Sequence, residues 1–349
     1  MLPESMFGVE LRGHGGPECL VWNDAIPTPK PGPGDVIVRV GAAGVNNTDI
    51  NTRVGWYSKG DNDADDASWT GEAISFPFIQ GIDACGEIVA VGDGVEPSRI
   101  GERVLVEPCM REFGGETLNP VWFFGSDCNG AFAEYTRVAS RHAHEVDSTL
   151  TDIELASFPC SYSTAENMLT RTRVSSEDTV VITGASGGVG SAAVQLAKAR
   201  GSNIIAIANA AAHDHLGKLG AARTLDRGTD LIAALGQESI DVVIDLVAGP
   251  KWPKLLDVMK RGGRYAVSGA VAGPIVELDV RTLYLKDLSF FGCTALEPEV
   301  FGNLVKLIES GAISPLVAKS FALRDITAAQ TAFADKGYVG KIVLKVRED

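Results

Sequence analysis

Short runs of apolar residues separated by turn residues fill roughly the first 150 positions of the chain. Residues 36–40, 86–92 and 103–106 are such runs, and the first of them follows the turn sequence PGPG at 31–34. Apolar runs of this length between turn signals are typical of strands, and their close spacing favours an irregular, barrel-like β domain.

The pattern changes after this region to strand-like runs that alternate with helix-like stretches. The runs lie at 179–182, 204–208, 224–225, 242–245 and 264–267, with helical patterns up to residue 200, up to about residue 220 and at 252–259. Such alternation predicts a parallel sheet covered on both faces. A helix at 300–309 and a strand at 341–345 are expected to complete the chain.

The turn after the run 179–182 carries the sequence ASGGVG and opens a helical stretch. This is the dinucleotide fingerprint with alanine in place of its first glycine. Gly187 lets the backbone approach a pyrophosphate, Gly190 allows the helix to pack closely on the sheet, and the helix amides face the phosphates. The sequence therefore predicts a nucleotide site formed by Ala185, Ser186, Gly187, Gly188, Val189 and Gly190.

Cofactor choice is expected at the end of the second strand of this unit. A site for NAD normally carries an acidic residue there, about 20 residues after the fingerprint, to bind the ribose 2′-hydroxyl. This chain has Asn209 followed by three alanines, so no carboxylate opposes a 2′-phosphate. Arg227 follows the third strand and is either the cation for that phosphate or a solvated surface residue. We therefore predict NADPH as the cofactor, with Asn209 and Arg227 in its site.

Charge and apolar content exclude several other classes of protein. The chain has 31 Lys and Arg against 45 Asp and Glu, a net charge of −14, which disfavours nucleic acids and anionic membranes as partners. Neither a membrane-spanning apolar run nor a signal peptide is visible, so we expect a cytoplasmic protein. The six cysteines form no CxxC pair, and 39 glycines are an excess that the nucleotide turn partly explains.

Several separated motifs together resemble the medium-chain dehydrogenase/reductase superfamily, in its zinc-independent quinone oxidoreductase (zeta-crystallin-like) branch. They are GVNNTD at 44–49, RVGWYS at 53–58, ITG at 182–184, GGR at 262–264, LYLKDL at 283–288 and GKIVL at 340–344. The resemblance implies an α/β protein in which a Rossmann doubly wound parallel sheet is inserted in a GroES-like β-rich substrate domain. We expect the GroES-like domain at 1–152 and 293–349 and the Rossmann domain at 153–292.

The resemblance also bears on metal binding. Zinc enzymes of this superfamily hold a catalytic metal with Cys, His and Cys, and a catalytic zinc needs three protein ligands. By resemblance those positions fall on Asn46, Ile82 and Cys160 here. An amide, an isoleucine and one cysteine make no tight zinc site, so we expect zinc-independent chemistry and no metal ligands. Cys160 is then a small buried residue or, alternatively, a reactive thiol.

Without a Lewis acid, reduction of an activated acceptor is easier than oxidation of an alcohol. The expected function is NADPH-dependent hydride transfer to a quinone or an α,β-unsaturated carbonyl. The family positions that line the site fall on Asn46 and Tyr57 as catalytic donors and on Thr164, Ser268 and Gly269 beside the cofactor. Asn46 is alternatively a turn residue, and Tyr57 a lid or core aromatic.

Two other functions stay open at this point: a zinc-type alcohol dehydrogenase with non-standard ligands, and a catalytically silent nucleotide-binding protein. The segment 109–128, rich in aromatic residues, either walls an apolar substrate pocket or forms a subunit contact. The apolar run 288–291 would promote aggregation if it formed an exposed edge strand. We therefore expect a homodimer formed by sheet extension, acting on a small molecule.

Overall fold

A computed structural model describes residues 2–58, 68–70, 73–335 and 337–347, which divide into two compact units. The first unit is Met1–Cys160, Pro315–Gly337 and Lys341–Asp349, and the second is Ser161–Ser314 and Tyr338–Gly340. Within the described ranges, no helix is both long and apolar enough to cross a membrane.

The first unit is built on a seven-stranded, mostly antiparallel sheet. Its order is β16-β17-β3-β4-β5-β9, with β8 also paired to β3. The strands are β3 (Asp35–Val45), β4 (Cys85–Val91), β5 (Arg103–Val106), β8 (Tyr135–Ala139), β9 (Ala143–Glu145), β16 (Val317–Ala322) and β17 (Lys341–Lys345). The central strand β3 is buried along most of its length because its neighbours cover both edges.

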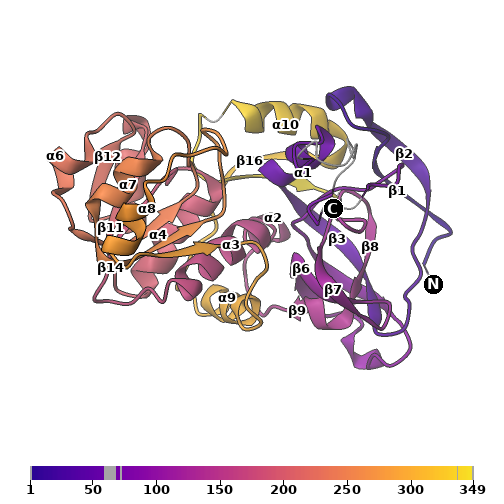
Figure 1. Cartoon of the computed structure of the whole chain (residues 1–349). Helices are drawn as coiled ribbons and strands as arrows, with labels where there is room; N and C mark the ends of the chain where they lie inside the picture. Colours follow the sequence, from indigo (N-terminus) through magenta and orange to yellow (C-terminus); the bar gives the residue numbers. More distant parts are fainter. Residues whose placement is uncertain (1, 59–67, 71–72, 336, 348–349) are drawn as a thin grey trace. The chain divides into compact units, whose positions relative to one another are not determined.

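The described residues of this unit also form two hairpins and three α-helices (Figure 1). The hairpins are β1 (Ser5–Leu11) with β2 (Leu20–Pro27), and β6 (Cys109–Phe113) with β7 (Glu116–Phe123). The helices are α1 (Asn47–Arg53), α2 (Asp152–Leu155) and α10 (Ile326–Ala334). The last strand, β17, runs antiparallel to β3 with Ile342 opposite Val45, so the start of β17 lies beside the start of α1.

The second unit contains a six-stranded sheet in which every pairing is parallel. Its order is β12-β11-β10-β13-β14-β15, the doubly wound order of a Rossmann sheet. The strands are β10 (Thr179–Ile182), β11 (Asn203–Ala208), β12 (Arg223–Asp226), β13 (Ile240–Asp245), β14 (Met259–Val267) and β15 (Ser289–Gly292). The predicted fold class, a Rossmann sheet combined with a GroES-like β-rich domain, is therefore confirmed.

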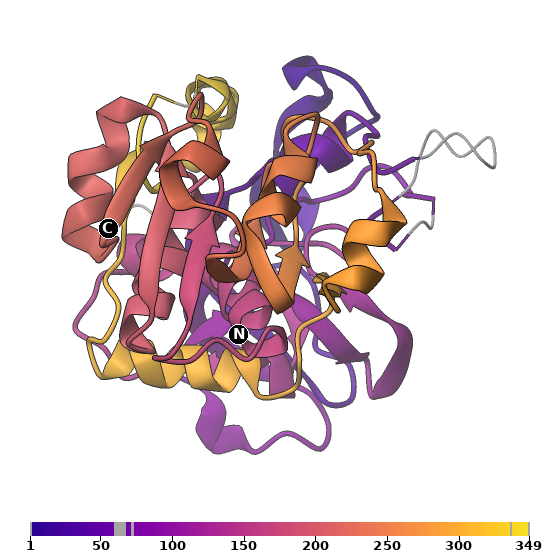
Figure 2. The same ribbon diagram turned by 60° about the vertical axis from the view of Figure 1, so that its left-hand side comes forward.

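Helices accompany this sheet, and Figure 2 shows the strands side by side with helical segments around them. They are α3 (Pro159–Arg171), α4 (Gly188–Ala199), α5 (His213–Leu219), α6 (Leu231–Leu235), α7 (Trp252–Val258), α8 (Val280–Leu285) and α9 (Val300–Glu309). Apolar side chains of the strands and of α7 form one buried cluster, which includes Val243, Trp252, Leu256 and Tyr265.

The division into units falls at residues 160/161 and 314/315, whereas the sequence analysis placed it at 152/153 and 292/293. The segment between 293 and 314 stays with the second unit because α3 and α4 hold it by hydrogen bonds. Asn167 on α3 donates to the carbonyl of Ala295 at 3.1 Å, and its own carbonyl accepts from the amide of Glu297 at 3.1 Å. Gln195 on α4 accepts from the amide of Ser314 at 2.9 Å.

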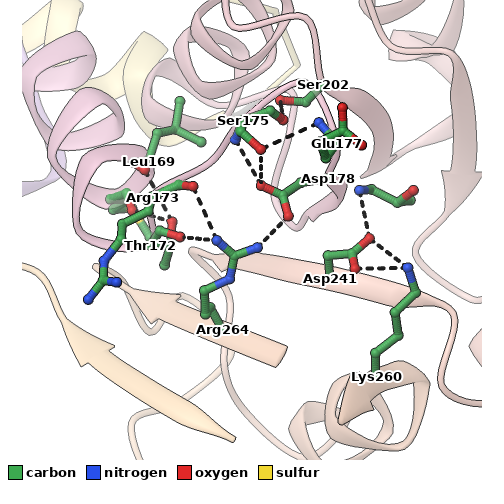
Figure 3. Close-up of polar contacts among 12 residues, drawn as sticks. Leu169, Thr172, Arg173, Ser175, Glu177, Asp178, Ser202, Asp241, Lys260 and Arg264 are labelled. Atoms are coloured by element: carbon green, nitrogen blue, oxygen red, sulfur yellow. Dashed lines mark hydrogen bonds and ion pairs between the residues drawn. The ribbon is translucent and has the colours of Figure 1, made fainter. Parts of the chain in front are cut away.

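An arginine clamp ties β14 to the segment that precedes β10 (Figure 3). Arg264 on β14 donates to the carbonyls of Thr172, at 2.7 Å, and Arg173, at 3.1 Å, and it pairs with the carboxylate of Asp178. Asp178 directly precedes β10, so the clamp lies at the end of that strand opposite the nucleotide turn. This position gives the clamp a structural role that is separate from cofactor binding.

Candidate functional site

Fingerprint residues 188–190 begin helix α4. The turn before them, between β10 and α4, contains the other three, 185–187. Gly184 opens it with φ of +59°, and Gly187 is the N-cap of α4. A Cβ on Gly190 would lie 2.3 Å from the carbonyl oxygen of Gly184 and 2.6 Å from the Cα of Ala185. Only glycine at position 190 therefore lets the helix approach the turn this closely.

The same turn presents free helix amides in the way a pyrophosphate requires. The first intrahelical bond of α4 runs from the amide of Ser191 to the carbonyl of Gly187, at 2.9 Å. The amides of Gly188, Val189 and Gly190 precede that bond and point out of the helix N-terminus. With the positive end of the helix dipole, they form an anion site of the kind that dinucleotide pyrophosphates occupy. The residues present thus fit a dinucleotide cofactor.

The end of the second strand carries no carboxylate but has cations nearby. Asn209 directly follows β11 and is exposed, and Arg227 directly follows β12 and is exposed. The side chain of Lys251 donates to the carbonyl of Arg227 at 2.9 Å, which brings a second cation to this end of the sheet. Sequence reasoning missed Lys251 because it lies 24 residues after Arg227 in the chain.

Ser268 and Gly269 follow β14 at the carboxyl edge of the sheet. Ser268 Oγ donates to the carbonyl of Cys293 at 2.8 Å, and its amide donates to the carbonyl of Asp245 at 3.2 Å. A Cβ on Gly269 would lie 2.8 Å from the carbonyl oxygen of Leu246. Both residues therefore stand in the same rim as the fingerprint turn. Thr164 comes from a different element, α3, where it is half-buried.

A buried carboxylate holds this rim rigid. Asp245, at the end of β13, accepts from the hydroxyl of Thr183 at 2.5 Å and from that of Tyr265 at 2.6 Å. Burial and the nearby carboxylate of Asp245 raise the pKa of Tyr265, so its hydroxyl stays protonated and donates. These bonds connect β10, β13 and β14 at their carboxyl ends, where the cofactor candidates lie.

In the first unit, Asn46 begins helix α1 as its N-cap. Its backbone amide donates to Asp49 Oδ2 at 2.7 Å, the reciprocal bond of a capping box. Its side-chain amide donates through Nδ2 to Asp83 Oδ2 at 2.8 Å. Asn46 is thus a helix-capping residue and also part of a buried polar cluster.

The centre of that cluster is Lys341, the first residue of β17. Its ammonium donates to Asn46 Oδ1 at 2.5 Å and to Asp83 Oδ2 at 2.8 Å. Lys341 is 3% exposed and Asp83 is fully buried. The other oxygen of Asp83 accepts from the backbone amide of Cys160 at 2.6 Å. We call Asn46, Asp83 and Lys341 the lysine cluster.

Asp49 lies next to the lysine cluster and is also buried. Burial raises its pKa to about 7, and the charge of Asp83 adds to this effect, while the amide of Asn46 and the charge of Lys341 oppose it. Within the described residues, Asp49 Oδ1 has no hydrogen-bond partner. The carboxyl group of Asp49, whose pKa is raised to about 7, therefore lies beside the bonded pair of Lys341 and Asp83.

Tyr57 stands beside this cluster at one end of a row of stacked rings. Its pKa is raised, chiefly by burial, and the charges of Cys160 and Asp49 contribute. Its ring stacks on Trp69 with centroids 5.7 Å apart, and Trp69 stacks on Phe123 at 4.4 Å. Phe123 is the last residue of β7, so one residue of the segment 109–128 stacks on Trp69, which in turn stacks on Tyr57.

The three positions that the resemblance assigned to zinc ligands do not fit a metal. Asn46 is bonded at both ends of its amide, Ile82 is apolar and buried, and a buried ammonium stands beside them. Cys160 is the one residue of the three with a thiol. Throughout the part of the chain that the structure describes, no group of three or more His, Cys, Asp or Glu side chains is placed to hold a metal ion.

A GroES-like β unit joined to a Rossmann unit with a dinucleotide turn defines a nucleotide-dependent oxidoreductase. The alcohol dehydrogenase GroES-like domain family matches residues 32–148, and the zinc-binding dehydrogenase family matches residues 188–310. The chain belongs to the medium-chain dehydrogenase/reductase superfamily, which confirms the resemblance noted in the sequence.

Similar proteins include both reductases and alcohol dehydrogenases. The acryloyl-coenzyme A reductase of Metallosphaera sedula is 29% identical, covering 97% of this chain and 99% of its own. The quinone oxidoreductase of Homo sapiens is 26% identical, covering 97% of each chain. The solved structure of a Sinorhizobium meliloti 1021 protein described as an alcohol dehydrogenase is 43% identical, with a TM-score of 0.91 over 99% of this chain and 97% of that chain.

Proposed function

We propose that this protein transfers a hydride from NADPH to a quinone or an α,β-unsaturated carbonyl, without zinc. The observation that carries the proposal is the lysine cluster, in which an amide, Asn46, stands at the first position where metal-dependent members need a ligand and is bonded to the buried Lys341 and Asp83. The similarity to an acryloyl-coenzyme A reductase and to a quinone oxidoreductase supports this choice of acceptor.

The chemistry asks two things of the protein. Bound NADPH supplies the hydride, and the acceptor oxygen then carries negative charge until it is protonated from solvent. Hydrogen-bond donors aimed at such an oxygen lower the barrier. Tyr57 suits this task because its phenol hydroxyl is a hydrogen-bond donor and stands beside the lysine cluster. The resemblance assigns Asn46 the role of a second donor.

A turnover screen on the purified protein tests this proposal. NADPH and NADH oxidation is followed with quinones, enones, enoyl thioesters and aldehydes, with and without a chelator, and the metal content is measured in parallel. We expect NADPH-driven reduction of a quinone or conjugated carbonyl that the chelator does not change. Stoichiometric, tightly bound zinc in active protein would instead favour a zinc-type alcohol dehydrogenase. Tight NADPH binding with no turnover would favour a silent nucleotide-binding protein.

The preference for NADPH rests on Arg227, Lys251 and the uncharged Asn209. A cation that binds the 2′-phosphate contributes about 1.5–3 kcal/mol, or roughly 10- to 100-fold in affinity. We expect Arg227→Ala to weaken NADPH binding by about this factor and to leave NADH binding unchanged, as measured by cofactor fluorescence titration. An equal loss for both cofactors would contradict a phosphate-binding role for Arg227.

We also propose that the protein forms a homodimer through the edge strand β15. This strand pairs with β14 along one side and ends the sheet order on the other. The segment before it exposes apolar side chains, with Val271 at 74% and Ile275 at 85%. An unpaired edge beside exposed apolar surface favours strand pairing with a second copy. Sedimentation equilibrium at micromolar concentration is expected to give twice the chain mass, and a monomer there would refute the proposal.

A further inference from the structure

A small cavity in the first unit is lined by charged side chains that the proposed reaction does not use. Its volume is about 200 Å³, and the charged residues that line it are Arg39, Glu87, Arg103, Asp152 and Arg347. They come from β3, β4, β5, the start of α2 and the residues after β17, all within the first unit. The nucleotide turn belongs to the second unit, so the cavity is a separate feature.

Two of the three guanidinium groups in this cavity are each paired with a carboxylate. Arg39 donates through Nη2 to Glu87 at 2.8 Å. Arg103 donates to Asp152 Oδ1 through Nε at 2.8 Å and through Nη2 at 2.6 Å. Its Nη1 donates to the carbonyl of Ser148 at 3.1 Å, so Arg103 is fixed by three bonds.

The third guanidinium group, that of Arg347, adds a charge that is not compensated. Its side chain is exposed and forms no ion pair within the described ranges. Its backbone amide donates to the carbonyl of Gly41 at 3.3 Å, which holds this residue against β3. The lining therefore carries a net charge of +1 in a chain whose net charge is −14. A concave surface with such a charge attracts anions.

Arg39 also has hydrogen-bonding capacity that the protein leaves unused. Its Nε is buried and has no hydrogen-bond partner in the described part of the chain. A buried donor without an acceptor is costly, and an anion in the cavity that Arg39 lines would supply an acceptor. Burial raises the pKa of Tyr135, which faces Arg39 across the strands, and the charges of Arg39 and Arg347 oppose this effect. Both guanidinium groups thus act on the same place.

Glycines form the rest of the lining and leave the space open. A Cβ on Gly41 would lie 2.0 Å from Asp152 Oδ2, and a Cβ on Gly86 would lie 2.2 Å from the carbonyl oxygen of Arg39. The cavity has room for about six water molecules, at about 30 Å³ each. Pockets for larger organic ligands measure about 300–1,000 Å³. The size therefore suits a small anion and excludes a dinucleotide.

We propose that this cavity binds a tetrahedral oxyanion, either a phosphate ion or the phosphate group of a small molecule. Guanidinium groups bind phosphate oxygens through charge-assisted hydrogen bonds. Here the guanidinium groups come from β3, from β5 and from Arg347. A tetrahedral anion offers oxygens in all these directions, whereas a carboxylate offers two oxygens in one plane. The bound anion joins Arg347 to Arg39 and Arg103, and it holds the residues after β17 against β3. The site is independent of hydride transfer.

Isothermal titration calorimetry on the full chain, at constant ionic strength, tests the proposal with inorganic phosphate, sulfate and malonate. We expect one saturable site for phosphate and for sulfate, and weaker binding of malonate. Arg347→Met and Arg39→Met should each lower the phosphate affinity by about 10- to 100-fold, the equivalent of one charge-assisted hydrogen bond. The matched control, Arg141→Met, removes an exposed arginine of the same unit that lies outside the cavity, and it should bind phosphate like the wild type.

Two additions to the titration identify the site and the source of the phosphate. The nucleotide turn also attracts phosphate, so the titration is repeated with saturating NADPH, and the site is expected to persist. A phosphomonoester, glycerol 3-phosphate, is compared with inorganic phosphate, and the tighter of the two identifies the source. The proposal would be overturned by no saturable phosphate binding, by malonate binding as tightly as phosphate, or by loss of the site when NADPH is added.

Thermal unfolding gives a second measurement that does not depend on heats of binding. Arg347→Met is expected to fold, because the side chain that it removes is exposed and unpaired among the described residues. A ligand that binds the folded state raises the unfolding temperature as its concentration rises. We expect phosphate to do so in the wild type and in Arg347→Lys, which keeps the charge, and not in Arg347→Met. An equal rise in Arg347→Met would contradict the assignment of Arg347 to the site.

Discussion

Gly190→Ala is the sharpest test of the nucleotide turn, because the space for one methyl group is measurable there. The new Cβ would lie 2.3 Å from the carbonyl oxygen of Gly184 and 2.6 Å from the Cα of Ala185. Both neighbours are backbone atoms, so relief requires the turn and helix α4 to separate. That movement would displace the amides that face the pyrophosphate.

The size of the effect follows from this overlap. Forcing a methyl group into a tightly packed site typically costs about 1–3 kcal/mol. For a unit the size of residues 161–314, this corresponds to a fall in unfolding temperature of roughly 2–12 °C. We expect this fall by calorimetry, together with at least about a tenfold loss of NADPH affinity, the equivalent of one lost charge-assisted hydrogen bond.

Gly187→Ala is the matched control in the same turn. A Cβ there has one neighbour within 4 Å, the carbonyl oxygen of Gly184 at 3.4 Å, and the backbone φ of −75° suits alanine. We expect wild-type thermal stability, and weaker NADPH binding because the methyl group stands where the pyrophosphate approaches. If Gly190→Ala unfolds at the same temperature as the wild-type protein and binds NADPH with the same affinity, the close helix packing inferred for this turn is wrong.

Three further substitutions address stability. Arg264→Met removes the clamp of Figure 3 and should lower the free energy of unfolding in urea by about 2–4 kcal/mol. The NADPH affinity should stay unchanged. Lys260→Met removes an exposed ion pair and should lower the free energy of unfolding by less than about 1 kcal/mol. Burial raises the pKa of Glu107, but hydrogen bonds from His142 and His144 outweigh it and lower the pKa from the ordinary value of 4.5 to about 2. This stabilisation is present above pH 4.5 and is lost as the pH falls to 2, so Glu107→Gln should lose about 3 kcal/mol at pH 7 and little at pH 2. A pH-independent difference would contradict this assignment.

The local elements of this fold could be predicted because their signals lie close together in the chain. The strand β10, the glycine turn and the helix α4 are contiguous, and each has its own residue pattern. The alternation of strands and helices was enough to predict the parallel sheet. The capping role of Asn46 was also accessible, since its partner Asp49 is three residues away.

The membership of the segment 293–314 could not be predicted in the same way. Chain order suggests that it returns to the β-rich domain, but helix α9 packs within the second unit. What holds the segment are side-chain bonds from α3 and α4, which join residues 119–130 positions apart. No local pattern reports which of two folded units such bonds connect.

The lysine cluster shows the same limit at the candidate site. Lys341 is 258 positions from Asp83 and 295 from Asn46, and it becomes their neighbour because β17 pairs with β3. In the sequence, this lysine is simply the first residue of a predicted terminal strand. Taken one by one, the ligand positions hold an amide, an isoleucine and a cysteine. These residues indicated only that the site binds a metal ion poorly. The pairing of β17 with β3 adds what the sequence did not indicate, because it places the Lys341 ammonium beside the positions where metal-dependent members carry their ligands.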